Sequence, residues 1–182
     1  MGDFYKLFYL PEKEYGSIIK LVLEYINVKF ENHPIKYADL PQIDMELLNN
    51  LPLLELGGTF KVKGILPILR HLQQKYGCHS KECLDSAESI AQCIQDFDVK
   101  VNNNNCLNDN DEVTDFLSLI TDLLNKNKNG FLTESGVTFM DFYAAEKLEH
   151  IMFKFDEYSD QFPEILAFIR TIFSLSKIEI KV

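Results

Sequence analysis

The sequence lacks any apolar run that approaches the ~20 residues needed to cross a bilayer. Its first six residues contain neither a basic region nor a long apolar segment of the kind found in secretory signals. Basic residues are few, because 18 lysines and arginines stand against 28 aspartates and glutamates, and the formal net charge is −10. Such a chain is poorly suited to displace counterions from nucleic acid or from an anionic membrane. These absences predict a cytoplasmic protein that binds neither.

Paired metal-ligating residues are absent as well. Cys78, Cys83, Cys93 and Cys106 lie within one stretch of 29 residues, but none belongs to a Cys-x-x-Cys pair. The histidines are scattered, and His79 beside Cys78 has no second ligand pair. We therefore expect free thiols in a reducing compartment and no bound metal.

What the chain does contain is enough apolar sequence for a sizeable core, since 46% of its 182 residues are hydrophobic. Phe4–Leu10 predicts a strand buried on both faces. Apolar residues between Ile18 and Ile26 recur at helical spacing, and Val28–Glu31 alternates like a second strand. The crossover is long enough to make the two strands parallel, which predicts a βαβ unit.

A hairpin entered through proline follows. Leu51–Leu56 and Thr59–Gly64, joined by Gly57–Gly58, predict two antiparallel strands with a tight turn. Proline cannot donate to a sheet ladder, so Pro52 belongs at the entry of its strand. Ile65–Tyr76 then predicts a helix. The order βαβ, then ββα, is the thioredoxin-like arrangement with a mixed four-stranded sheet.

The sequence after this helix has no convincing strand pattern. We expect a thioredoxin-like domain over residues 1–77, a linker over 78–83 and an all-helical domain over 84–182. Val101–Asp111 is rich in Asn and Asp and is expected to be a solvated loop. Ile178–Val182 alternates, and it predicts either a strand or an unwound end.

Two helix starts are recognisable in the second half. Thr138 can cap the third helical amide while Asp141 reaches back to the amide of Thr138, which is the pattern of a capping box. Val137 and Phe142 would supply the accompanying hydrophobic staple. A last helix is expected over Phe162–Leu175, with its proline in the first turn.

Three stretches resemble a cytosolic glutathione transferase, and most of all the sigma class. Tyr5–Tyr9 resembles the family's first strand, and Leu51–Leu56 resembles the strand entered through its cis-proline. Gly136–Tyr143 resembles the family's capping box with its staple. The resemblance covers nearly the whole chain. It implies the glutathione-transferase fold and a cis Leu51–Pro52 bond. The spacing between Phe97 and Thr138 departs from the family and predicts a shortened helical domain.

In the family, a tyrosine hydroxyl at the end of the first strand donates a hydrogen bond to the glutathione sulfur. Such a donor stabilises thiolate over thiol. Tyr9 stands at that position, although it could also be a core aromatic beside Phe4 and Phe8. Leu51 would pair through its backbone with the cysteinyl part of glutathione if Pro52 is cis, but the same sequence also suits a plain strand entry.

Other positions depart from the family pattern, which implies a divergent glutathione site. Lys63–Gly64 replaces the Gln-Ser or Glu-Ser pair that binds the γ-glutamyl carboxylate. Gly64 keeps an amide at a helix N-terminus, and Lys63 offers a charge in place of the hydroxyl. Tyr15, Leu40 and Asp44 replace an arginine, a tryptophan and a lysine. Losing several contacts of roughly 1–1.5 kcal/mol each predicts glutathione binding weaker by about two orders of magnitude or more.

An acidic cluster that some sigma members carry at the dimer interface survives here only at Asp96. Gln92 and Gln95 occupy the neighbouring positions of that cluster. Amides in place of carboxylates argue against a metal at this place.

The resemblance implies an enzyme that conjugates glutathione, as co-substrate, to apolar electrophiles in detoxification. It also implies a homodimer in which the first domain of one subunit faces the helices of the other. A glutathione-dependent isomerase or peroxidase would use the same thiolate. The replacements at Tyr15, Leu40, Asp44, Lys63 and Gly64 instead favour a non-catalytic scaffold or binding module of the same fold.

Overall fold

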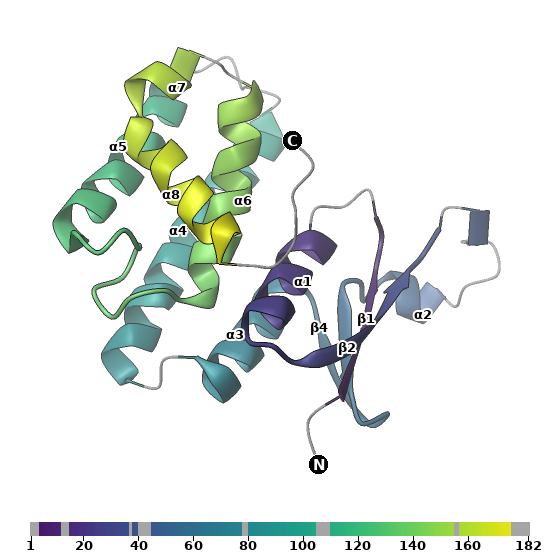
Figure 1. Ribbon diagram of the computed structural model, residues 1–182. Helices are drawn as coiled ribbons and strands as arrows, with labels where there is room; N and C mark the ends of the chain where they lie inside the picture. The colour runs from purple at the N-terminus through teal and green to yellow at the C-terminus, as the bar shows by residue number, and fades with distance from the viewer. Residues whose placement is uncertain are drawn as a thin grey trace. The chain divides into compact units, whose positions relative to one another are not determined.

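The computed structural model describes residues 4–11, 15–36, 38–39, 45–77, 80–104, 110–154 and 157–175. The described chain forms two compact units, one made of the residues up to Tyr76 together with Leu175 and one over Gly77–Ser174 (Figure 1). The helix α4 begins at Lys81, so three residues of the segment expected as a linker are helical.

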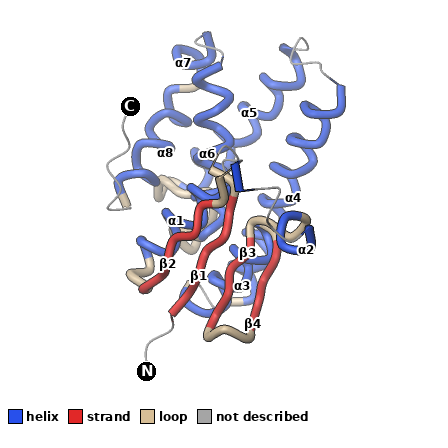
Figure 2. Tube along the Cα trace, turned by 90° about the vertical axis from the view of Figure 1, so that its right-hand side faces the viewer, coloured by secondary structure: helices blue, strands red, loops and turns tan. Residues whose placement is uncertain are grey.

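The first unit is built on a mixed four-stranded sheet with strand order β2-β1-β3-β4 (Figure 2). Its strands are β1 (Phe4–Tyr9), β2 (Lys29–Pro34), β3 (Leu53–Leu56) and β4 (Phe60–Lys63). β1 pairs parallel with β2 and antiparallel with β3, and β3 pairs antiparallel with β4. The predicted βαβ-ββα sheet is therefore confirmed.

Two helices of this unit cover one face of the sheet. The unit contains three helices, α1 (Tyr15–Tyr25), the short α2 (Met45–Leu48) and α3 (Ile65–Tyr76). The two that cover this face are α1 and α3, which contact each other and the strands beneath them. Tyr5, Leu7 and Tyr9 of β1 are buried toward this face, as the two-residue period of a strand requires.

The opposite face of β1 is partly solvated. Lys6 lies there and pairs with Glu31 of β2, with Nζ and Oε2 3.7 Å apart, and both side chains are exposed. Phe8 on the same face is half-buried and stacks on His33. The prediction that β1 is buried on both faces is wrong, because charged neighbours keep the second face in contact with water.

The hairpin of β3 and β4 has the predicted form. The Leu51–Pro52 bond is cis, which confirms the prediction, and Pro52 is buried at the entry of β3. The amide of Gly64, directly after β4, donates to the carbonyl of Pro52 at 2.8 Å. The start of β3 and the start of α3 are therefore joined by a backbone hydrogen bond.

The second unit is helical throughout its regular structure. Its helices are α4 (Lys81–Asn104), α5 (Asn110–Asn127), α6 (Phe139–Lys154), α7 (Glu157–Gln161) and α8 (Pro163–Ser174). α6 packs against α4 and α8, and its first two turns are buried on every side; its buried apolar residues include Phe139, Met140, Phe142, Tyr143, Ala144, Ala145 and Leu148. No helix in the described part of the chain is long and apolar enough to span a membrane.

The expected loop over Val101–Asp111 is shorter than predicted. α4 continues to Asn104 and α5 starts at Asn110, while residues 105–109 lie outside the described residues. Extending an existing helix adds a hydrogen bond for each residue fixed, and asparagine costs at most ~0.7 kcal/mol relative to alanine. The asparagines Asn102–Asn104 are therefore still helical. The predicted tail Ile178–Val182 also lies outside the described residues.

The start of α6 is held by Asp141. Its Oδ2 accepts from the Thr138 amide at 2.6 Å and from the Thr138 hydroxyl at 2.8 Å, and its Oδ1 accepts from the Leu132 amide at 2.8 Å. The aspartate half of the predicted capping box forms. The threonine half of the box does not form as predicted, because the Thr138 hydroxyl donates to the Asp141 carboxylate. The Asp141 amide donates instead to the Thr138 carbonyl at 3.1 Å. Burial raises the pKa of Asp141, and the three hydrogen bonds oppose that rise.

Candidate functional site

The residues predicted for a glutathione site follow one another along one end of the sheet. Phe8, next to the last residue of β1, pairs with Leu53, the residue after Pro52. Leu53 in turn pairs with Lys63, the last residue of β4. Adjacent strands lie ~4.8 Å apart, so this end spans about 10 Å across β1, β3 and β4. Register alone therefore gathers residues that are up to 55 positions apart in sequence.

The side chain of Tyr9 turns toward α1. Its ring lies directly against Gly16, where an added Cβ would come within 2.0 Å of Tyr9 Cδ2. Tyr9 is only 7% exposed. The sequence signal for this close approach is a glycine in the first turn of a helix, where no tight turn requires one, but the pattern of residue types alone does not assign it to the site.

Lys20, one turn after Gly16 on α1, binds the Tyr9 hydroxyl. Its Nζ donates to Tyr9 Oη at 3.2 Å and lies 4.9 Å from the centroid of the ring. A phenol has one O–H to donate and lone pairs to accept, so Lys20 leaves the O–H of Tyr9 available to another acceptor. A cationic donor on the oxygen also makes that O–H a stronger donor.

Glu24 lies one further turn along α1. Burial raises the pKa of Glu24, and the positive charge of Lys20 opposes that rise. Lys20 is half-buried and lies between an acidic side chain and the phenol. Lys20 is not predicted by the sequence pattern either, because apolar periodicity does not report where a polar side chain of the same helix points.

The backbone at Leu51–Pro52 is partly engaged within the protein. The Leu51 amide donates to the Leu48 carbonyl at 3.5 Å, which is the long limit of a hydrogen bond and therefore weak. The Gly64 amide, expected from sequence to face an anion, instead donates to the Pro52 carbonyl. That expectation for the Gly64 amide is wrong, because the amide continues the ladder between β3 and β4.

The first turn of α3 keeps two amides for an anion. Pro67, its third residue, has no N–H, and the Ile68 amide donates to the Gly64 carbonyl at 3.2 Å. The amides of Ile65 and Leu66 are the remaining first-turn donors. Gly64 itself has a φ of 82°, a left-handed conformation that a serine adopts only with strain.

Lys63 lies on the other face of the sheet from Tyr9. Directly paired residues share a face, so Lys63 lies with Leu53 on the side of α2. There it lines a hollow of about 180 Å³ with Glu46, Asn50 and Lys61 among others. The backbone of Lys63 is therefore close to the predicted site, but its side chain points to the other face of the sheet.

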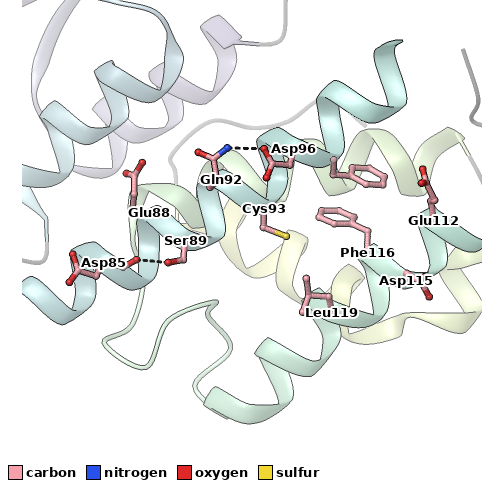
Figure 3. A pocket seen from close by; sticks show the side chains of 11 residues that line it. Asp85, Glu88, Ser89, Gln92, Cys93, Asp96, Glu112, Asp115, Phe116 and Leu119 are labelled. Atoms are coloured by element: carbon pink, nitrogen blue, oxygen red, sulfur yellow. Dashed lines mark hydrogen bonds between the residues drawn. The ribbon is translucent and has the colours of Figure 1, made fainter. Parts of the chain in front are cut away.

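The other predicted positions are placed as follows. Tyr15 is the first residue of α1, and Leu40 and Asp44 lie outside the described residues. Gln92 donates to Asp96 at 2.7 Å on α4 (Figure 3). Within the described ranges, no three His, Cys, Asp or Glu side chains are grouped so that they could hold a metal ion.

Residues 84–180, more than half of the chain, match the family model described as glutathione S-transferase, C-terminal domain. The chain belongs to the glutathione transferase family. The sheet unit and its helices have the arrangement that this family membership requires, and the structures similar to it have the same fold.

Individual relatives agree with this family. Hematopoietic prostaglandin D synthase of Mus musculus is 30% identical over 96 residues, which cover 51% of this chain and 48% of that protein, so the chain spans about half of this relative's length. A glutathione S-transferase of Plasmodium yoelii yoelii is 24% identical over 180 residues, covering 90% of this chain and 86% of that one. The solved prostaglandin synthase D of Nilaparvata lugens matches with a TM-score of 0.79 over 94% of this chain and 92% of its own, at 24% identity.

Proposed function

We propose that this glutathione transferase family member activates glutathione with Tyr9 and conjugates it to apolar electrophiles. The observation that carries the proposal is the hydroxyl of Tyr9, fixed by Lys20 at 3.2 Å at the sheet end that also holds Leu51–Pro52. Membership of the family supplies the reaction class, and the residues below supply the roles.

In the proposed reaction, the O–H of Tyr9 donates to the glutathione sulfur once the thiol proton has passed to water. This hydrogen bond favours the thiolate at neutral pH. The thiolate then forms a bond to the electrophilic carbon, and the leaving group departs with its electron pair. Lys20 does not touch the substrate; it is a positioning residue that orients the phenol and strengthens its O–H as a donor.

The peptide part of glutathione is proposed to lie along the Leu51 backbone. The 3.5 Å bond from the Leu51 amide to Leu48 is weak enough for a substrate carbonyl to replace. The γ-glutamyl carboxylate would meet the amides of Ile65 and Leu66. With the Gly64 amide already bonded and Lys63 on the other face, each lost contact costs about tenfold in affinity, and we expect millimolar binding.

The proposal is tested by titrating glutathione into the protein in a calorimeter and then measuring conjugation of an aryl halide. We expect measurable heat at millimolar glutathione and a conjugation rate at least tenfold lower in Tyr9→Phe. The absence of heat at millimolar glutathione would end the proposal. Equal rates in the two proteins would keep the enzyme and remove Tyr9 as its activator.

Three alternatives use the same fold. An isomerase is favoured by the relatives named prostaglandin D synthase, and it would leave the amount of reduced glutathione unchanged, whereas conjugation consumes it. A peroxidase would convert glutathione to its disulfide. A non-catalytic scaffold is favoured by Gly64 and Pro67, which weaken the anion site.

We also propose a cytoplasmic homodimer, as the family resemblance implies. The sheet unit of one copy would face the helices of the other. Sedimentation at micromolar protein concentration would reveal a species of twice the mass of the chain, 21.1 kDa. A species of 21.1 kDa at every concentration would contradict the dimer.

A further inference from the structure

The loop between α5 and α6, residues 128–138, contains the one Asn-Gly pair of the chain, Asn129–Gly130 (Figure 1). An asparagine before glycine has a distinct chemistry, because the glycine has no side chain to shield its amide nitrogen from the asparagine side chain. Both residues are exposed. The loop lies wholly within the second, helical unit and contains none of the residues assigned above to glutathione.

The side-chain amide of Asn129 holds the loop on both sides of Leu132. Its Oδ1 accepts from the Phe131 amide at 2.9 Å, and its Nδ2 donates to the carbonyls of Thr133 at 2.8 Å and Glu134 at 3.3 Å. Leu132 and Thr133 are each only 2% exposed. One exposed side chain therefore fixes a segment of the loop that is buried.

This segment is bonded in turn to the start of α6. The Leu132 amide donates to Oδ1 of Asp141, the buried carboxylate of the first turn, at 2.8 Å. The Thr133 hydroxyl donates to the Gly136 carbonyl at 2.8 Å, and the Gly136 amide donates to the Thr133 carbonyl at 3.3 Å. Because these bonds are consecutive, we expect a change in the side chain of Asn129 to reach the first turn of α6.

The peptide bond after Asn129 is accessible. The amide of Gly130 has no hydrogen-bond partner among the described residues, and a Cβ added at Gly130 would meet nothing within 4 Å. Gly130 and Lys128, on either side of Asn129, have φ values of 82° and 55°, both in the left-handed region. Water and hydroxide can therefore reach the Gly130 nitrogen.

We propose that Asn129–Gly130 is a spontaneous deamidation site, and that deamidation uncouples this loop from α6. Hydroxide removes the proton of the Gly130 amide, and the nitrogen attacks Cγ of Asn129 to close a cyclic imide. The Cγ–Nδ2 bond breaks, and its electron pair leaves with ammonia, to which water supplies the proton. Water then opens the ring to aspartate or to isoaspartate, whose main chain passes through the former side-chain carbon.

The folded loop controls the rate of this reaction. For Cγ to be attacked, the side chain of Asn129 must rotate out of its three hydrogen bonds. The reaction therefore proceeds from the opened loop, and its rate follows the fraction of molecules in which the loop is open.

The product does not allow the loop to close as before. An ionised carboxylate at position 129 has no N–H to donate, so the carbonyls of Thr133 and Glu134 lose their partner. Its negative charge also faces these two carbonyl oxygens directly. Deamidation is therefore an irreversible step that leaves the start of α6 less firmly held.

The first test incubates the full-length protein at mildly alkaline pH and locates the modified residues by peptide mapping with mass spectrometry. Conversion should be found at Asn129 and not at Asn125 or Asn127, which are followed by lysines. The rate should rise in proportion to the hydroxide concentration. It should also rise about tenfold when urea unfolds the protein, because the three hydrogen bonds are then lost.

The second test loosens the loop from the side of α6. Asp141→Asn weakens the anchor of the Leu132 amide, so the loop should open more often and Asn129 should convert several times faster. Ser135→Ala is the control, since Ser135 is exposed in the same loop and takes no part in these bonds; it should convert at the parental rate. Low urea concentrations, at which circular dichroism still shows folded protein, should accelerate conversion without any substitution.

The third test measures the effect of the product. Asn129→Asp reproduces one product, and its unfolding equilibrium constant in urea should exceed that of the parent about tenfold, as the loss of two hydrogen bonds predicts. Ser135→Asp adds the same charge to the same loop but keeps the Asn129 amide, so it should change the constant far less. The proposal is overturned if conversion is spread evenly over the asparagines or is equally fast in folded and unfolded protein. It is also overturned if Asn129→Asp is as stable as the parent.

Discussion

Replacing Lys20 by methionine removes the ammonium that donates to Tyr9 and keeps an unbranched side chain of similar length. A hydrogen bond to a charged group is worth about 1.5–3 kcal/mol, so we expect kcat for conjugation to fall about tenfold with KM for glutathione nearly unchanged. The pH–rate profile should shift to higher pH, because a weaker donor stabilises the thiolate less. Steady-state kinetics across pH measure both effects.

Lys20→Arg is the control for this substitution, since it keeps a cationic donor. It should retain most of the activity and the original pH profile. If arginine and methionine lower kcat equally, or if neither does, Lys20 has no role in orienting Tyr9. A separate loss of all glutathione binding would instead count against the proposed function itself.

Gly16 affects the position of the Tyr9 ring by steric contact, whereas Lys20 acts on it by charge and hydrogen bonding. In Gly16→Ala the new Cβ would lie 2.0 Å from Tyr9 Cδ2, so the ring must move away. Overpacking of this kind costs about 1–3 kcal/mol, and the hydrogen bond from Lys20 should be lost with it. Urea unfolding should therefore show a lower midpoint, and conjugation should fall. Ser17→Ala, at the exposed neighbour, should change neither quantity by much.

Gly64 offers a gain-of-function test. In Gly64→Ser the residue must keep a φ of 82°, which costs about 1–2 kcal/mol of stability for a side chain with a Cβ. The added hydroxyl can donate to the γ-glutamyl carboxylate, and we expect glutathione to bind about tenfold more tightly. Gly64→Ala carries the same backbone strain without the hydroxyl. Equal affinity in the two variants would show that the carboxylate does not bind at this turn.

The sequence predicted which residues lie at this end of the sheet better than it predicted the hydrogen-bond partners of their backbone groups. Tyr9, Leu51, Pro52, Lys63 and Gly64 meet at one sheet end because strand order and register follow from the βαβ-ββα pattern. Whether a backbone amide is already bonded, as at Gly64, depends on the ladder beside it. That information is absent from the pattern of residue types.

Among the elements, the start of α6 depends on one buried carboxylate. In Asp141→Asn the single side-chain oxygen cannot accept from the amides of both Leu132 and Thr138, and one buried amide is left unsatisfied. An unsatisfied buried donor costs about 1–3 kcal/mol, which urea unfolding would measure. Thr138→Val leaves the amide contact in place and should cost less.

The pH dependence of this cost has a definite sign. Burial raises the pKa of Asp141 above 3.8, so the folded protein holds the proton more tightly than the unfolded chain does. The free energy of unfolding therefore falls as pH rises from about 3.8 to the raised pKa and loses nothing further above it. The cost of Asp141→Asn should be largest at acidic pH and smaller at neutral pH. A cost that grows with pH would show that the three hydrogen bonds outweigh burial.

Element boundaries were predicted well where a start or stop signal has a local cause. Pro163 opens α8 as expected, and Gly57–Gly58 forms the tip of the hairpin. The asparagines at the end of α4 were predicted to lie in a loop, but Asn102–Asn104 are helical, because asparagine weakens a helix only slightly. The burial of β1 on both faces was also predicted wrongly, because Lys6 and Glu31 become neighbours on its solvated face only once the strands pair.

For the molecule as a whole, the charge after Tyr76 predicts how copies associate. Each copy carries −10, so association of two copies is opposed at low ionic strength and should strengthen as salt screens the repulsion. Sedimentation at low and moderate salt tests this. A dimer fraction that is independent of salt would contradict the prediction.

The same division of charge determines how the protein would adsorb to a positively charged surface. On an anion-exchange resin the helical unit supplies the net attraction, because residues 1–76 contain nine acidic and nine basic side chains and the excess of acidic side chains lies after Tyr76. Adsorbed molecules would therefore be attached through one unit and share a common orientation. The sheet end that holds Tyr9 takes no part in this attachment, so protein immobilised in this way should still take up glutathione from the mobile phase.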